Sequence, residues 1–158
     1  MKGRLLCLLL AVLTLGGCWQ RQEGTAYAVY YRHQSAGQEA ALAAESRPLP
    51  AGKEPVEGLL ELLLSDPQQE GLTRAIPAGV SLRRWAIHNG LLTVDFSGGY
   101  GALSGVALTL ADYSVVLTLT QLEEVEAVMI TVDGEMPAYR DHQRLRPEDA
   151  WLALVSDG

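Results

Sequence analysis

Cysteine is nearly absent from this chain of 158 residues, which contains only Cys7 and Cys18. Two cysteines are too few for a disulfide framework or a cysteine-rich zinc site. The three histidines, His33, His88 and His142, are scattered and form no H-x-x-x-H or H-E-x-x-H pattern. Spacings of that kind place zinc ligands together, so the sequence predicts no metal site.

Basic residues are also scarce, because 12 Lys and Arg stand against 19 Asp and Glu for a formal charge of −7 at pH 7. Such a surface disfavours nucleic acid and anionic lipid headgroups as partners. A nucleophilic serine in a G-x-S-x-G turn is missing as well. Without a nucleophile, a metal set or a cofactor loop, the sequence predicts a protein that is not an enzyme and needs no cofactor.

Long apolar runs are limited to Leu5–Leu15, which is shorter than the roughly 20 residues that a membrane-spanning helix requires. Lys2 and Arg4 precede this run and small residues follow it, which is the layout of a secretory signal. We therefore expect residues 1–17 to be a signal peptide, with a buried core helix as the alternative. Removing them, with two basic residues and no acid, leaves 141 residues and a charge of −9.

The end of this segment, Leu15-Gly16-Gly17-Cys18, resembles a bacterial lipobox. The resemblance implies that the Cys18 thiol accepts a diacylglyceryl group carrying fatty acids such as palmitate, and that residues 18–24 form a lipidated N-terminus and tether. Two or more acyl chains give stable anchoring, whereas one chain is marginal. The expected location is the extracytoplasmic side of the cell membrane. A secreted protein with a chance cysteine at its cleavage site is the alternative.

The remaining chain, residues 25–158, is expected to form one domain of alternating short elements. Residues 25–31 are rich in aromatic and β-branched side chains and predict a strand. Residues 34–54 suggest an exposed loop, because prolines punctuate their end. A helix is predicted to open at residues 54–58 and to end near residue 64, with a proline and acids in its first turn.

Residues 81–96 predict a β-hairpin, because Asn89-Gly90 is the pair that best accepts a type I′ turn. Leu92, Val94 and Phe96 alternate with polar residues and should share one face. Leu82 is out of phase with the apolar residues that follow it, so a bulge is expected near residues 83–84.

Apolar residues recur at helical spacing from 103 to about 122, although residues 115–120 also have strand propensity. A strand over 126–132 and a turn at 133–134 follow. Residues 140–146 suggest a surface loop, and residues 147–154 a short helix or a final strand. This order predicts an α+β fold in which two helices lie on one face of a small mixed sheet.

Two features raise the question of a chemical site. Gly99–Gly105 follows a strand and opens a helix, as a phosphate-binding loop does, but its G-x-G-x-x-x-G spacing also suits a flexible connection. Asp95 is on the second strand of the predicted hairpin and Asp133 directly follows the strand 126–132, so neighbouring strands would bring the two together as an acid and base or as ligands of a metal. Exposed, solvated charges are the simpler interpretation of these two aspartates.

Five segments in a fixed order are similar to the GerMN domain of sporulation and spore-germination proteins. They are Leu59-Leu-Glu-Leu-Leu-Leu-Ser-Asp-Pro67, Gly71-Leu-Thr-Arg-Ala-Ile-Pro-Ala-Gly79, Leu91-Leu-Thr-Val-Asp-Phe-Ser97, Thr118-Leu-Thr-Gln-Leu122 and Val128-Met-Ile-Thr-Val-Asp-Gly134. The resemblance covers residues 56–134 and implies a fold like the ring-building motifs of sporulation channel proteins. This chain differs from the founding member of the family, because it carries one copy of the domain and not two.

The resemblance implies a non-catalytic, membrane-anchored assembly or interaction module in sporulation or germination. Its partner would be another envelope or sporulation protein, or a second copy of the chain, bound through a sheet edge or the helical face. The alternative is an envelope lipoprotein that binds a solute or glycan in a pocket lined by Trp85, Trp151 or the tyrosines Tyr27, Tyr30 and Tyr31.

Overall fold

The computed structural model of the protein describes residues 25–35, 41–137 and 143–153, the last three of these by their backbone alone. Its strands are β1 (Ala26–His33), β2 (Leu42–Pro48), β3 (Leu72–Thr73), β4 (Leu82–His88), β5 (Leu91–Phe96) and β6 (Ala127–Val132). Its helices are α1 (Pro55–Leu63) and α2 (Gly105–Leu119), with two 3-10 helices, η1 (Gly98–Ala102) and η2 (Pro147–Ala153).

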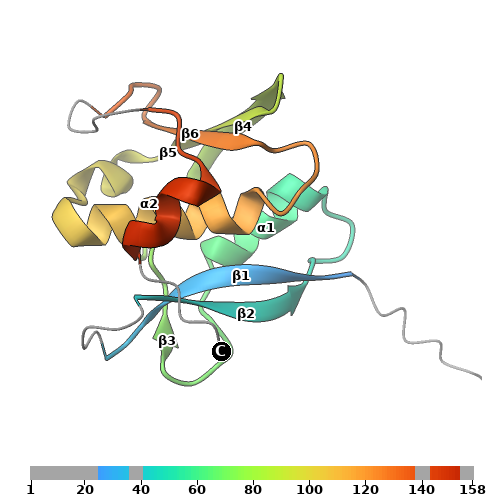
Figure 1. The fold of residues 1–158 in the computed structure, drawn as a ribbon, viewed down its shortest axis with the longest axis vertical. Helices are drawn as coiled ribbons and strands as arrows, with labels where there is room; N and C mark the ends of the chain where they lie inside the picture. The colour runs from blue at the N-terminus through green and yellow to red at the C-terminus, as the bar shows by residue number, and fades with distance from the viewer. Residues whose placement is uncertain (1–24, 36–40, 138–142, 154–158) are drawn as a thin grey trace, which may run out of the picture.

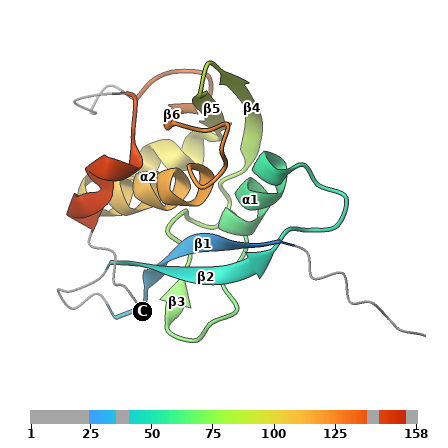
Figure 2. The ribbon, with the colours of Figure 1, turned by 45° about the vertical axis from the view of Figure 1, so that its right-hand side comes forward.

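The six strands form two sheets, and the two α-helices lie between them (Figures 1 and 2). One sheet has the order β2-β1-β3 and is antiparallel throughout. The other has the order β4-β5-β6, with an antiparallel hairpin and a parallel β5–β6 pair. The predicted α+β class, with a small mixed sheet and two helices on one face, is confirmed. A second sheet on the other side of the helices was not foreseen.

Helix α1 and the β4–β5 hairpin follow the sequence pattern closely. Asn89 and Gly90 have φ values of 48° and 75°, which the type I′ turn requires. The register shifts between Leu82 and Arg84, where the bulge was expected. The extra residue in the bulge places the Leu82 side chain on the same face of the hairpin as Trp85. The bulge therefore compensates for the break in alternation that the sequence shows at Leu82.

The loop expected over residues 34–54 is wrong, because residues 42–48 form β2, which pairs with β1 from Ala26 to Arg32. Leu42, Glu45 and Arg47 are buried, although alanines give the segment little strand propensity. The surface loop expected over 140–146 is also wrong where the structure describes it. Leu145 is buried and exchanges two backbone hydrogen bonds of 2.9 Å with Val128 on β6.

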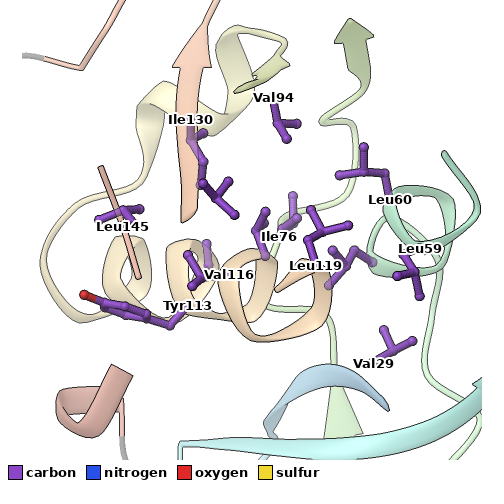
Figure 3. Close-up of a cluster of buried hydrophobic side chains, with 14 of the residues drawn as sticks. Val29, Leu59, Leu60, Ile76, Val94, Tyr113, Val116, Leu119, Ile130 and Leu145 are labelled. Atoms are coloured by element: carbon purple, nitrogen blue, oxygen red, sulfur yellow. The ribbon is translucent and has the colours of Figure 1, made fainter. Parts of the chain in front are cut away.

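The core lies around α2, as the buried side chains in Figure 3 show. Ten of the fifteen residues of α2 are buried, because one side of the helix faces β1 and the other faces β6. Apolar residues on more than one side of a helix are typical of such a position between two layers. Within the described part of the chain, no helix is long and apolar enough to cross a membrane.

Polar side chains on α2 complete the edge of β1 that β2 leaves open. Thr118 Oγ1 accepts a 3.0 Å hydrogen bond from the Tyr30 N–H, and Ser114 Oγ donates a 2.7 Å bond to the Tyr30 carbonyl. Gln121, which follows the end of α2, accepts a hydrogen bond from the Ala28 N–H and donates one to the Ala28 carbonyl. The helix therefore takes the place of a neighbouring strand, which explains why hydroxyl groups are buried within it.

Candidate functional site

A groove lies between α1 and the start of β4 and has a volume of about 400 Å³. Its lining residues are Glu57, Glu61, Leu64, Ser65 and Leu82. The volume falls in the range of about 300–1,000 Å³ that is usual for ligand sites. We call this feature the α1–β4 groove.

The sequence builds this groove from the exposed side of an amphipathic helix. Leu59, Leu60 and Leu63 turn into the core, which leaves Glu57 and Glu61, one turn apart, on the outer side of α1.

Leu64 caps α1 at its C-terminal end, where its carbonyl accepts a 3.0 Å hydrogen bond from Arg74. The half-buried Leu82 contributes the opposite wall, because the bulge turns its side chain toward the helices.

Charge around the groove is negative on balance. Lys53 Nζ lies 2.6 Å from a Glu57 oxygen and 3.4 Å from a Glu61 oxygen, so one cation faces two carboxylates. The hydrogen bond and charge of Glu57 are the main reason that the pKa of Lys53 is raised. Apolar side chains flanked by a net negative charge suit a ligand that has an apolar group next to a cation.

The two candidate aspartates do come together, but in a structural network. Asp95 is only 2% exposed, so the prediction that it is a solvated charge is wrong. Its carboxylate accepts hydrogen bonds from the Thr131 hydroxyl at 2.8 Å and from the Gly134 N–H at 2.7 Å. Arg83 bridges the cluster, since its Nη1 lies 2.9 Å from Asp133 and its Nε 3.4 Å from Asp95.

Burial is the largest influence on the pKa of Asp95 and on its own would raise it. The Gly134 N–H, the Thr131 hydroxyl and the charges of Arg84 and Arg83 together outweigh burial and lower the pKa below the ordinary value of 3.8. An ionised carboxylate held in this way ties the end of β6 to the hairpin. Asp133, by contrast, stays exposed as expected.

The glycine-rich segment after β5 is a closely packed connection. Tyr100 is fully buried, stacks on Phe96 with ring centroids 4.8 Å apart, and donates a 2.8 Å hydrogen bond to Asp112 on α2. A Cβ on Gly99 would lie 3.3 Å from a Val80 methyl group, and one on Gly101 equally close to Val132. Close packing around Tyr100 therefore accounts for Gly99 and Gly101.

The other predicted residues are spread over the chain. Cys18 and its lipobox residues Leu15, Gly16 and Gly17 lie outside the described residues, as do His142 and the side chain of Trp151. Tyr31 is fully buried, and Trp85, Tyr27 and Tyr30 are each partly buried against the core. None of these four residues is among those that line the α1–β4 groove. In the described part of the chain, no three His, Cys, Asp or Glu residues gather as metal ligands would.

Sequence reasoning missed the groove because Leu82 is distant in the chain from α1. It also missed the buried pair of Glu45 and Arg47, whose atoms lie 3.1 Å apart. Glu45 accepts hydrogen bonds of 2.8–3.1 Å from the N–H groups of Gln68 and Gln69, and thereby holds the loop after α1. The alternation of small and charged residues at 44–47 was the available signal.

Two helices packed between a β2-β1-β3 sheet and a β4-β5-β6 sheet are the fold of a GerMN-type domain. The first GerMN domain of the sporulation protein GerM from Bacillus subtilis superposes with a TM-score of 0.67 at 20% identity, over 79% of this chain and 99% of that one. The tandem GerMN domains of the same protein give 0.65 at 21% identity, over 79% of this chain and 47% of that one. A candidate lipoprotein from Clostridium perfringens superposes with a TM-score of 0.51 at 18% identity, over 79% of this chain and 89% of that one.

The family model named Germane, whose description is sporulation and spore germination, matches residues 28–137. The chain therefore belongs to this GerMN-domain family, as its five sequence segments predicted. No curated protein matches it closely enough to count as a relative.

Proposed function

We propose that this protein is a non-catalytic, lipid-anchored interaction module of the cell envelope that acts in sporulation or spore germination. Membership of the family supports the connection with spores. The lipobox at residues 15–18 supports an anchor on Cys18, and the fold shared with a candidate lipoprotein is consistent with that anchor. The α1–β4 groove is the observation that carries the interaction role.

The occupant that we propose for the groove is a segment of another envelope protein with an apolar side chain next to a lysine or arginine. The apolar side chain would contact Leu64 and Leu82. The basic side chain would meet Glu57 and Glu61, which Lys53 neutralises only in part. Complementary charge of this kind gives selectivity and faster association more than it gives affinity.

The test compares chromosomal variants in the native host. Cys18→Ala should release the protein from the membrane fraction and lower the count of heat-resistant spores. The double variant Glu57→Lys/Glu61→Lys should stay in the membrane but also lower the count, because it repels a basic partner. The matched control Glu123→Lys/Glu124→Lys makes the same charge change at two exposed residues away from the groove and should sporulate normally.

Deletion of the gene sets the scale for these counts. A deletion strain with an unchanged spore count would reject the role in spores. Equal loss from both double variants would reject the groove as the partner site, since charge alone would then explain the defect.

A ligand-binding lipoprotein is the second candidate, because the groove volume also suits a small molecule. Thermal shift of the purified protein with cell-wall fragments and cationic metabolites separates the two. Stabilisation that Glu57→Lys/Glu61→Lys abolishes would favour this second function over a protein partner.

A further inference from the structure

Most strand edges of the described structure are already covered or interrupted. The edge of β1 is completed by α2 and β3, and the outer edge of β6 is bonded to Leu145 and Glu135. The outer edge of β4 is interrupted by a bulge and carries Arg83 and Arg84. Bulges and charged side chains are the devices by which natural edge strands avoid pairing with another chain.

From Ala44 to Pro48 the outer edge of β2 has no bulge, and its two charged side chains, Glu45 and Arg47, are buried and paired with each other. The backbone groups of Ala28 and Tyr30 point toward α2, so their partners across the strand pair, Ser46 and Ala44, must direct their own backbone groups away from β1. Both residues are exposed, and their side chains are small and uncharged.

The accessible part of this edge is short. Leu42 is 0% exposed, so its outward backbone groups are closed to a partner. Pro48 offers a carbonyl but no N–H. A strand that pairs here must therefore use Ala44, Ser46 and the Pro48 carbonyl.

We propose that β2 pairs antiparallel with β2 of a second copy of the chain, about a two-fold axis at Ser46. In this register Ser46 opposes Ser46 of the partner subunit, and the two residues exchange two backbone hydrogen bonds. The Ala44 N–H of each chain donates to the partner's Pro48 carbonyl. The two sheets then continue as one six-stranded sheet.

Charge selects this register over its neighbour. Glu45 lies opposite the partner's Arg47, on the face where each chain already pairs the same two residues 3.1 Å apart. A shift of the axis to Glu45 would oppose Glu45 and the partner's Glu45, and like charges directly across a ladder are destabilising. A shift to Ala44 would require the closed backbone of Leu42.

This pairing deepens the proposed interaction role and rests on it, because a short ladder is favoured when both copies are held on one membrane. The first experiment introduces Ser46→Cys or Ala44→Cys into the full chain in its native host and oxidises isolated membranes. Opposed residues at 46 would have Cα atoms about 5.5 Å apart, within the disulfide range of about 4.4–6.8 Å. The two residues at 44 would be about 14 Å apart.

The expected result is a covalent dimer from Ser46→Cys that reductant reverses, at about ten times the yield from Ala44→Cys or more. The unsubstituted chain controls for Cys7 and Cys18. Absence of this dimer, or equal dimer from both variants, overturns the pairing. The proposed function is judged separately, by the spore counts of the deletion strain and of the groove variants, whatever the result of the oxidation.

Discussion

The substitution Thr118→Val tests whether α2 truly replaces a strand beside β1. Valine keeps the branched shape and nearly the same volume, but it removes the oxygen that accepts the Tyr30 N–H at 3.0 Å. Thr118 is 0% exposed, so water cannot take the place of that oxygen without rearrangement. The perturbation is therefore one orphaned backbone donor in an otherwise intact interface.

The expected cost follows from that single donor. Leaving a buried donor unsatisfied costs about 1–3 kcal/mol, and we take about 2 kcal/mol for the free energy of unfolding. For a domain of this size the same cost corresponds to a fall in Tm of roughly 6–10 °C. The matched control is Thr120→Val. The Thr120 hydroxyl donates only to the carbonyl of Val116 on α2, so its removal should cost about 0.5 kcal/mol or less.

Urea unfolding of a soluble form that begins at Trp19, followed by tryptophan fluorescence, measures both free energies. The unfolding slope m should not change, because neither variant alters the surface that unfolding exposes. If Thr118→Val and Thr120→Val cost the same within about 0.5 kcal/mol, the account of α2 as a substitute strand is refuted.

Three further substitutions test the polar network and the buried pair. Asp95→Asn should lower stability by about 1–3 kcal/mol at pH 7. Because the folded pKa of Asp95 lies below 3.8, the stability that its carboxylate contributes is complete above about pH 5 and is lost as the pH falls through the folded pKa. The difference in unfolding free energy between wild type and Asp95→Asn should therefore close over that pH range. Gly134→Ala should cost about 1 kcal/mol or more in thermal unfolding, since φ is 87° there; a stabilised variant would contradict the observed backbone. Glu45→Ala should cost about 3 kcal/mol or more in urea unfolding by leaving Arg47 buried without its carboxylate, and a neutral result would show that the pair is dispensable.

Local signals in the sequence were sufficient for the elements that neighbours in the chain define. The hairpin could be predicted because Asn89-Gly90 dictates its turn and the alternation of Leu92 and Val94 dictates its face. Strand β2 could not, because its alanines have no strand propensity and its stability comes from pairing with β1 and from the loop bound by Glu45.

The site shows the same division between local and distant contacts. The acids of the groove are visible as residues on the polar side of a predicted helix, whereas Leu82 joins them only after the chain has folded. Asp95 was misjudged because its neighbours along β5 give no hint of the arginines on β4 or the turn after β6. Partners from three separate segments decide whether a carboxylate on a strand is solvated.

The position of α2 has a consequence for how the domain folds and evolves. Neither sheet is complete without this helix, since it closes β1 by hydrogen bonds and joins β5 to its parallel neighbour β6 in the chain. Loss of α2 would expose both inner faces at once, so the two sheets should melt in one cooperative transition and not as separate units. A domain with such a shared centre can be copied as a whole but not divided, and whole copies are what the tandem GerMN domains contain.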